Sequence, residues 1–425
     1  MPSTPNNLDR FRESTERHLL PMLPGAVLDP NDGTGVKQMQ KYASVGTGAV
    51  RIKIRAEVPS KHYLSLHRSQ KFLEADLAIA DAFAKEFHRV SESGLAEGDY
   101  RDALVAGIPQ RVVVRIVAAA ASLDPSAVEV LGDQIELLRS WASQTYEGQS
   151  IASGLGLDAT QTGRDSSFAN FANVPAAKVV GDGVNSFYTF ASDGQVVDFV
   201  CLDDVDESGL EAFRYPHVFR RIAHWTHDER RTVVCLTRRG ETLVFAKGAL
   251  QFASRRGAWL HMNHDGALLT WTKVHDRKLR QAIFATTLDA PFSRSGACIA
   301  VLKGHGLKTT LAGSEPINIS DQIADTLAGA KGALLRTLVG ERKFQNLPRE
   351  IRRQLVAIDG AVVLGPDGTV HGAGAIVKVP GGSDGGGRLA ATRALATYGF
   401  AVKVSADGEI RAYQGQAAEP VYVGL

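Results

Sequence analysis

The sequence contains little cysteine and no long apolar run. Its 425 residues include three cysteines, Cys201, Cys235 and Cys298, which lie far apart along the chain. An odd number at such spacing excludes a disulfide framework and a zinc site of the Cys-x-x-Cys type. No stretch approaches the ~18 consecutive apolar residues of a membrane span. Met1–Asp32 is polar and contains several prolines, unlike a signal peptide. We therefore expect a cytoplasmic protein that has no membrane partner.

An excess of charge of one sign is also missing. Lysine and arginine together number 48 against 46 aspartates and glutamates, a formal net charge of +2. Such a balance gives no strong field to attract DNA or RNA, so nucleic acid is not an expected partner. The chain also lacks a Walker loop, a Gly-x-Ser-x-Gly elbow and the protein-kinase motifs. The common nucleotide-hydrolysing, esterase and kinase sites are therefore excluded.

Two histidine pairs have the spacing of metal ligands on a helix. These are His224 with His227 and His261 with His264. Neither pair has the flanking acid of a metalloprotease helix, and the second lies in a β-rich stretch, where residues three apart point to opposite faces. Surface or core histidines are the preferred interpretation. Cys298 lies within an apolar run, which favours a packed thiol over a nucleophile.

The hydrophobic pattern changes twice along the chain and predicts three regions. Residues 1–122 are interpreted as a mainly helical region, and residues 123–277 as a helix followed by a β-rich meander. Residues 278–425 have an α/β pattern. The predicted fold class is thus an α/β C-terminal domain, a mixed sheet flanked by helices, preceded by a β-rich segment and an N-terminal mainly helical region. The length agrees with two or three domains.

Particular elements support this division. Ala297–Leu302 is almost entirely apolar, which predicts a central strand covered on both faces. Arg231–Met262 predicts a meander with tight turns at Arg238–Gly240 and Lys247–Gly248. The helices and strands expected after this meander are helices at Lys278–Asp289, Ile319–Leu338 (with Ser320 as its cap), from Leu347 onward and at Arg388–Tyr398, and strands at Gly360–Leu364, Ala373–Val379 and Phe400–Ser405.

The strongest local signal lies in the last third of the chain. Asp359 and Gly360 precede an apolar strand, and a glycine-rich loop, Gly381–Arg388, leads into a helix. Backbone N–H groups of Gly385, Gly386 and Gly387, together with the helix N-terminus and the fork of Arg388, could bind phosphate. Asp359 could hold a divalent cation against that phosphate. Glycine loops and Asp-Gly turns are also common in proteins that bind no nucleotide, so both interpretations stay open.

Residues of about 278–413 resemble the nucleotide-binding domain of the diadenylate cyclases (the DAC domain). The Gly-Ala and apolar strand of 295–301 are similar to the family's first strand, and Asp359-Gly-Ala361 is similar to its Asp-Gly-Ala motif. The small-residue strand at 372–377 and the closing strand and turn at 402–410 follow in the family's order. Gly387–Ala391 stands where the family has Arg-His-Arg-Ala-Ala. The resemblance covers about a third of the chain.

The resemblance implies specific roles for these residues. In the family, the aspartate of Asp-Gly-Ala positions a metal ion and the attacking 3′-hydroxyl of one ATP, the Gly-Ala strand lies beside the adenine, and the Arg-His-Arg loop holds the phosphates. Two domains meet face to face. Asp359, Gly360 and Ala361 take these positions here, with Gly385, Gly386, Gly387 and Arg388 as phosphate contacts. The implied cofactor is Mg²⁺ or Mn²⁺, bound with the nucleotide at Asp359.

The chain departs from the family in the phosphate loop. Of Arg-His-Arg only Arg388 remains, and Leu395 and Ala396 replace an expected Ser-Glu. Because phosphoryl transfer depends on stabilising charge at the phosphate, this loss should slow catalysis by orders of magnitude while binding persists. The chain is therefore more similar to a divergent, sensor-type (DACNV-like) branch. The preferred hypothesis is a signalling protein that binds a nucleotide or cyclic dinucleotide, with an N-terminal region that transmits occupancy or mediates assembly.

Two alternatives stay open. The first is an active diadenylate cyclase, or a related nucleotidyltransferase, that makes a nucleotide messenger from ATP or other NTPs with Asp359 as a catalytic residue. The second is an interaction protein that keeps only the fold. The sequence does not determine the base bound or whether the chain forms a homo-oligomer.

Overall fold

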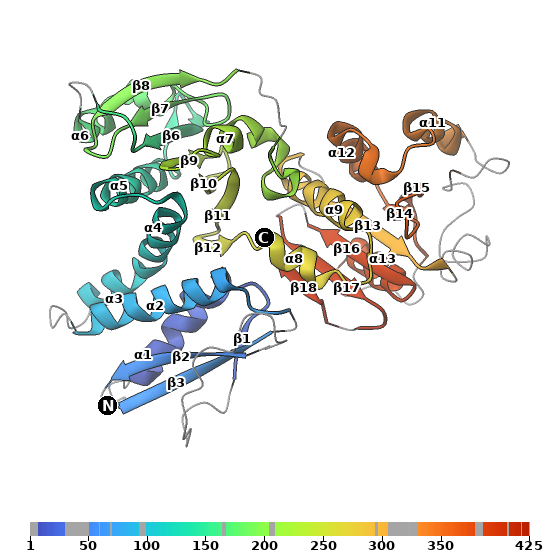
Figure 1. The fold of residues 1–425 in the computed structure, drawn as a ribbon, viewed down its shortest axis with the longest axis horizontal. Coiled ribbons are helices and arrows are strands. Elements are labelled where there is room, and N and C mark those ends of the chain that lie inside the picture. The colour runs from blue at the N-terminus through green and yellow to red at the C-terminus, as the bar shows by residue number, and fades with distance from the viewer. Residues whose placement is uncertain are drawn as a thin grey trace. The chain divides into compact units, whose positions relative to one another are not determined.

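The computed structural model divides the chain into two compact units. It describes residues 7–29, 51–58, 60–68, 70–92, 99–163, 167–203, 209–293, 296–304, 323, 330–378, 386–405, 408–417 and 419–424. Unit 1 comprises Met1–Leu210 and Phe219–Met262, and unit 2 comprises Glu211–Val218 and Asn263–Leu425. Both units combine helices with β-sheet, so the fold is mixed α/β (Figure 1).

The described residues of unit 1 form three sheets and a group of helices. Its helices are α1 (Asn7–Ser14), α2 (Glu74–Glu92), α3 (Asp99–Ala106), α4 (Ile108–Ala121), α5 (Pro125–Trp141), α6 (Phe168–Ala172) and α7 (Arg220–Trp225). Its strands are β1 (Val27–Leu28), β2 (Arg51–Val58), β3 (Ser60–His67), β4 (Thr145–Tyr146), β5 (Gln149–Ser150), β6 (Ser153–Asp158), β7 (Ser186–Phe190), β8 (Val196–Cys201), β9 (Arg231–Leu236), β10 (Thr242–Ala246), β11 (Ala249–Arg255) and β12 (Ala258–His261).

The mainly helical N-terminal region also contains a β-hairpin, which the sequence interpretation missed. Strands β2 and β3 pair antiparallel over eight positions, and β1 adds to the other edge of β3. Helices α1, α2, α3 and α4 lie in this region as expected, and the hairpin is an addition to the mainly helical pattern. The signal was present, because Ile52, Ile54, Ala56 and Val58 alternate with polar residues at the period of a strand.

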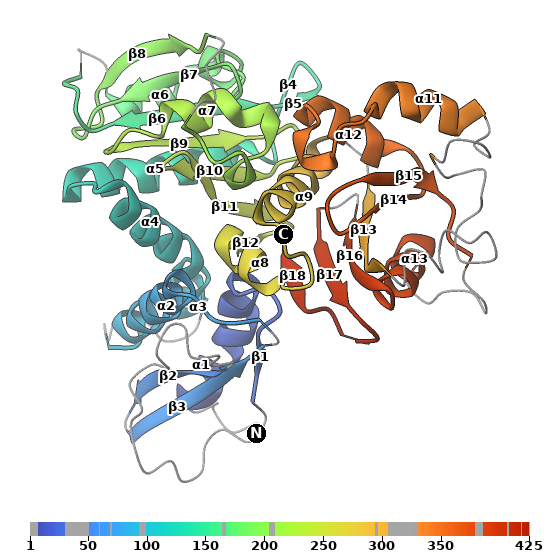
Figure 2. The ribbon, with the colours of Figure 1, turned by 45° about the vertical axis from the view of Figure 1, so that its right-hand side comes forward.

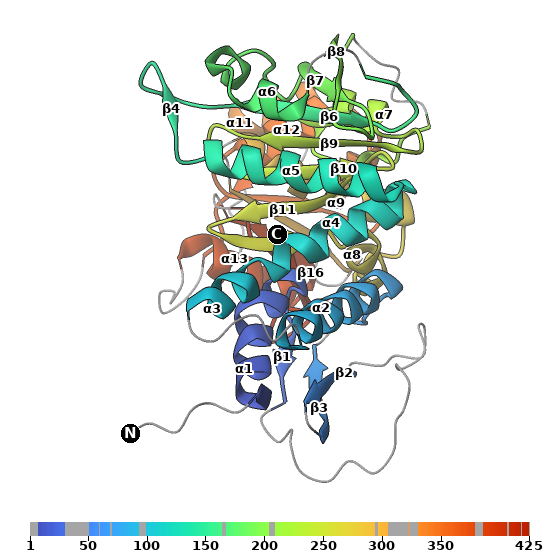
Figure 3. The same cartoon turned by 90° about the vertical axis from the view of Figure 1, so that its left-hand side faces the viewer.

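The predicted meander is confirmed. Strands β9, β10, β11 and β12 pair antiparallel in succession, and the turns between the first three fall at the predicted glycines, Gly240 and Gly248. They belong to a seven-stranded sheet of order β12-β11-β10-β9-β6-β7-β8. Helices α4 and α5 pack on this sheet, with α5 against β6, β9 and β10 (Figure 3). Buried residues of both helices, such as Val113, Val117, Leu131 and Ile135, join its core.

One segment of unit 1 has the length and composition of a membrane span. Asp102–Ala121 covers 20 residues with a mean hydropathy of 1.6, and a third of its most apolar window is buried. A core helix of a soluble protein passes the same test. Val112, Val113 and Val117 of this segment are fully buried against the rest of unit 1, which accounts for the apolar composition of that face.

Unit 2 is built around a six-stranded sheet of order β15-β14-β13-β16-β17-β18. Its elements are α8 (His264–Thr270), α9 (Arg277–Asp289), β13 (Ala297–Leu302), α11 (Ala330–Val339), α12 (Arg349–Ala357), β14 (Ala361–Leu364), β15 (Val370–Ala375), α13 (Gly387–Ala396), β16 (Gly399–Val404), β17 (Ile410–Gln414) and β18 (Tyr422–Gly424). Strand β13 pairs parallel with β14 and antiparallel with β16. The sheet is therefore mixed, with the predicted apolar strand at its centre.

Both faces of this sheet are covered, as the composition of β13 predicts. Cys298, Ala300 and Leu302 form one cluster with Leu389 and Leu395 of α13. The alternate residues of the same strand are buried on the opposite face, where α9 and α12 pack (Figure 2).

Most expected elements of unit 2 lie within two or three residues of the observed ones. Helices α9, α12 and α13 and strands β14 and β16 confirm the predicted sequence of elements. The strand expected at Ala373–Val379 is observed earlier, as β15 at Val370–Ala375. The expected helix Ile319–Leu338 is observed from Ala330, as α11, and its expected cap, Ser320, lies outside the described residues.

Candidate functional site

The structure brings together the two charged residues that the sequence singles out. Asp359 lies between α12 and β14, and Arg388 lies in the first turn of α13, 29 positions later. One terminal nitrogen of the Arg388 guanidinium donates to Oδ1 of Asp359 at 3.3 Å. The Asp359 side chain is 89% exposed and that of Arg388 is 42% exposed. Both groups therefore remain accessible to a ligand.

Two glycines position this pair. Gly296, immediately before β13, leaves space for the arginine, because a Cβ there would lie 2.8 Å from a guanidinium nitrogen of Arg388. Gly386 is the N-cap of α13 and has a φ of 89°, in the left-handed region. Gly386 and Gly387 are exposed, so the N-terminal end of α13 faces solvent. Gly385 lies outside the described residues.

Gly360 has a packing role. Its φ is 118°, and a Cβ there would lie 2.4 Å from the carbonyl carbon of Gly374 and 2.7 Å from the carbonyl oxygen of Ala375. Glycine is thus required where the start of β14 approaches the end of β15. Ala361 pairs with Ala375 and is buried in the cluster beneath α13. These two residues of the motif therefore shape the backbone beside Asp359, and neither presents a side chain to solvent.

We expect Gly360→Ala to destabilise unit 2 by about 1–3 kcal/mol, because alanine would be strained at this φ and would overlap the backbone of β15. Urea unfolding of the two proteins would measure this change. Gly387→Ala is the matched control, because a Cβ at Gly387 meets nothing within 4 Å and its φ is not positive. A Gly360→Ala protein as stable as the wild type would contradict this account.

A lysine that the sequence interpretation missed lies close to Asp359. Lys331, in the first turn of α11, donates from Nζ to the carbonyl oxygen of Gly374 at 2.5 Å. A Cβ on Gly374 would lie 3.2 Å from this Nζ and 3.0 Å from the carbonyl oxygen of Asp359. The ammonium is therefore near the backbone of Asp359. Lys331 therefore adds positive charge beside the site. No pattern in the sequence around Lys331 distinguishes it from an ordinary surface lysine.

The residues behind Arg388 form a buried polar contact. The Thr392 hydroxyl donates to the carbonyl oxygen of Arg388 at 2.7 Å and lies 3.2 Å from Sγ of Cys298. Burial raises the pKa of the Cys298 thiol to about 11, and the contact with Thr392 and the charge of Arg388 only partly oppose this. The thiol is therefore protonated at neutral pH, which agrees with a packed residue.

Among the described residues of the site, Asp359 has a carboxylate that could contact a metal ion. Among the described residues, no group of three or more His, Cys, Asp or Glu side chains is placed to hold a metal. A single carboxylate such as that of Asp359 is compatible with Mg²⁺, because this ion is commonly held by one or two carboxylates, water and the phosphates of a substrate. Its Oδ1 accepts from Arg388, which leaves Oδ2 for such an ion.

The histidine pairs occupy other parts of the fold. His224 lies in the last turn of α7, and His227 follows that helix. His261 is buried with its Nδ1 3.8 Å from Oδ1 of Asp76, and the His264 ring packs edge-on against Phe284. These positions agree with surface and core histidines.

Chemically, the described residues of the site combine an exposed guanidinium, an exposed helix N-terminus, a nearby ammonium and an accessible carboxylate. Such a combination can bind a phosphate through its cations and backbone donors. A scan against protein-family models finds no family that matches this chain, and a search of curated proteins finds none that is similar to it.

Proposed function

We propose that unit 2 is a degenerate DAC-like domain and that it binds a nucleotide or cyclic dinucleotide as the signal of a cytoplasmic regulatory protein. The pairing of Asp359 with Arg388, across 29 residues, at the N-terminal end of α13 carries this proposal. The mixed sheet with β13 at its centre and the close approach of Gly360 to Gly374 also support it.

The residues would act as follows. Arg388 exchanges its hydrogen bond to Asp359 for the phosphate, and N–H groups at the start of α13 add further donors. Asp359 is then available to a Mg²⁺ or Mn²⁺ ion that arrives with the nucleotide and neutralises part of the phosphate charge. Lys331 adds a second cation. The exposure of Asp359 and Arg388 favours reversible binding over catalysis, because charge stabilisation in a transition state needs fixed groups sheltered from water.

We expect Arg388→Ala to lower the affinity for the nucleotide by about 1.5–3 kcal/mol, or about 10- to 150-fold, because a charge-assisted hydrogen bond is lost. Isothermal titration of the purified protein with ATP and with cyclic di-AMP, each with Mg²⁺ or Mn²⁺, would measure this change. Arg393→Ala is the matched control on the same helix, where the guanidinium lies over the Tyr413 ring at 5.6 Å. Equal affinity of Arg388→Ala and the wild type would contradict the proposed site.

A product assay separates the sensor from the active cyclase. The protein is incubated with each NTP and Mn²⁺ or Mg²⁺, and bound and free nucleotides are then analysed by mass spectrometry. The proposal expects bound, unmodified nucleotide and a turnover far below that of an intact cyclase. If the wild type forms a dinucleotide and Asp359→Asn does not, the protein is an active cyclase and the sensor hypothesis is wrong.

A further inference from the structure

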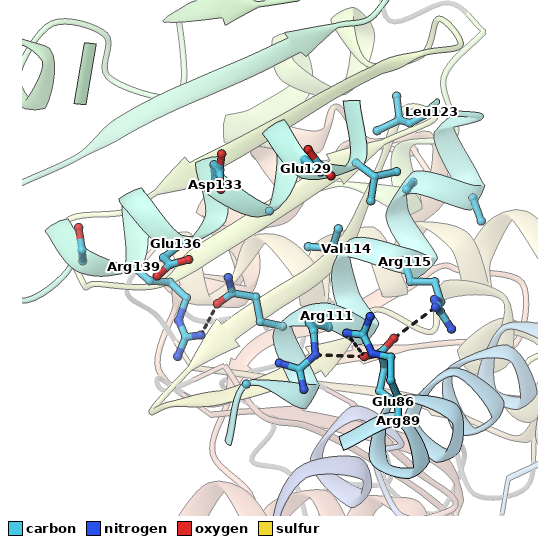
Figure 4. A pocket seen from close by; sticks show the side chains of 17 residues that line it. Glu86, Arg89, Arg111, Val114, Arg115, Leu123, Glu129, Asp133, Glu136 and Arg139 are labelled. Atoms are coloured by element: carbon cyan, nitrogen blue, oxygen red, sulfur yellow. Dashed lines mark hydrogen bonds and ion pairs between the residues drawn. The ribbon is translucent and has the colours of Figure 1, made fainter. Parts of the chain in front are cut away.

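A second concave surface lies in unit 1, between α2, α4 and α5. It encloses about 1090 Å³, and its walls carry opposite charges (Figure 4). We call it the α4–α5 groove. Its lining includes four arginines and four carboxylates, so its formal net charge is zero: Arg89, Arg111, Arg115 and Arg139, and Glu86, Glu129, Asp133 and Glu136.

The basic wall is held in place by one buried carboxylate. Glu86 of α2 is 3% exposed and accepts a hydrogen bond from Nε of Arg111 at 3.0 Å. It also forms ion pairs with Arg89 at 2.9 Å and with Arg115 at 3.2 Å. Three guanidiniums therefore share one negative charge, which leaves an excess of two positive charges on this wall. The Arg89 and Arg115 side chains are 66% and 50% exposed. Their geometry is fixed, and their charge still faces the groove.

The acidic wall carries an excess of negative charge, because its three carboxylates are accompanied on α5 by a single groove-lining arginine, Arg139. Glu129, Asp133 and Glu136 lie on one face of α5 at helical spacing, and they make no ion pair or hydrogen bond with any residue that the structure describes. Burial and the charges of Glu136 and Glu129 raise the pKa of Asp133 above its ordinary value. The arginines of the opposite wall pair with Glu86, and Arg139 with Gln110. The excess charge of each wall thus remains unmatched by the residues that the structure describes.

Small residues lie between the walls. Gly132, in the middle of α5, lines the groove, and a Cβ there would meet nothing within 4 Å. Ala118 and Ala119 of α4 also line it. A glycine in a helix interior weakens the helix, and nothing in the surrounding structure requires one at this position. A surface without side chains at this point allows another backbone to approach closely.

We propose that the α4–α5 groove is the contact surface between two copies of this chain, related by a twofold axis that sets the acidic wall of each copy against the basic wall of the other. A twofold interface must be self-complementary, which requires opposite charges on either side of the axis and a net charge near zero. The groove has both properties. An anionic ligand such as nucleic acid would match only the basic wall.

The geometry also indicates what fills the hollow. Helix α5 of one copy enters the groove of the other, with the closest approach at Gly132. The carboxylates of that helix then reach Arg89, Arg111 and Arg115 of the facing copy. This inference is independent of nucleotide binding, since every residue that carries it belongs to unit 1.

Sedimentation velocity of the full chain tests the proposal. We expect a concentration-dependent dimer that weakens as salt is raised, since the contacts are between charges. Gly132→Gln places a side chain where the two helices meet. It should raise or preserve the melting temperature, because glutamine is the better helix former, and should abolish the dimer. A melting temperature that is unchanged or higher, together with loss of the dimer, would exclude misfolding as the cause of that loss.

Charge reversal provides the specificity test. The exposed pair Glu129→Lys with Asp133→Lys should weaken the dimer at least ~100-fold, since like charges would then face each other. Arg89→Glu with Arg115→Glu should do the same, and a mixture of the two variants should form a heterodimer. Arg111 is left unchanged to keep Glu86 paired.

The proposal would be overturned if the wild type sediments as a monomer at protein concentrations up to ~100 µM, which is a hundredfold above a micromolar Kd. A dimer that survives Gly132→Gln and both reversals would also overturn it.

Discussion

Asp289→Ala should destabilise unit 2 by about 3–5 kcal/mol, because it leaves a buried arginine without its carboxylate. Asp289, at the end of α9, is 2% exposed. Its two oxygens accept from Arg349 Nε at 2.7 Å and from Arg349 Nη2 at 2.8 Å. Oδ1 also accepts from the backbone N–H of His217 at 2.6 Å, and Arg349 donates to the carbonyl oxygen of Tyr215 at 2.6 Å. One carboxylate therefore joins α9, α12 and the segment 211–218.

The measurement is urea unfolding at neutral pH, with hydrogen exchange of peptides from α9 and α12 to assign the loss to unit 2. Asp265→Ala is the matched control, because that carboxylate is 55% exposed and pairs with Arg214 at 3.2 Å on the surface. A surface pair contributes at most about 1 kcal/mol. Replacement of both partners, Asp289→Leu with Arg349→Met, should recover part of the stability, since no unpaired charge remains. A loss below about 1 kcal/mol for Asp289→Ala would contradict this account.

Asp76→Ala should have a similar effect in unit 1, about 3–5 kcal/mol, for the same physical reason. Asp76 and Arg68 form an ion pair in which neither side chain is exposed. Arg68 also donates to the carbonyl oxygens of Gln70 at 3.1 Å and Lys71 at 2.7 Å, and Asp76 accepts from the backbone N–H of Leu73 at 2.8 Å. This network fixes the start of α2. Asp81→Ala is the control, since Asp81 pairs with Lys85 on the exposed side of the same helix.

The contribution of Asp76 should also depend on pH. Burial alone would raise its pKa, but the interaction with His261, whose Nδ1 lies 3.8 Å from Oδ1, and the charge of Arg68 outweigh burial and hold the pKa below its ordinary value. A carboxyl whose folded pKa is lowered stabilises the protein fully above its unfolded pKa, about 3.9, and loses that contribution as the pH falls through the folded pKa. The stability difference between the wild type and Asp76→Asn should therefore be constant above about pH 5 and shrink below about pH 4. A difference that grows on acidification would contradict the assignment.

Local patterns were sufficient for most of unit 2 and for the meander of unit 1. An all-apolar run such as Ala297–Leu302 can only be stable with cover on both faces, so its central position follows from composition. Turns at Gly240 and Gly248 need a left-handed backbone, which glycine adopts without strain. The β2–β3 hairpin was missed because neighbouring helical patterns dominated the interpretation, although its alternation was visible.

The sequence by itself determined which residues could bind phosphate, because guanidinium, carboxylate and glycine-rich backbone have this chemistry wherever they lie. Only the tertiary structure decided that Asp359 and Arg388 meet, that Gly360 is required by the backbone of β15, and that Lys331 lies nearby. The same holds for the ion pairs of Asp76 and Asp289 and for the two charged walls of the α4–α5 groove. The physical reason is that these contacts join residues far apart in the chain. Their energies depend on burial and distance, which no local pattern of residues contains.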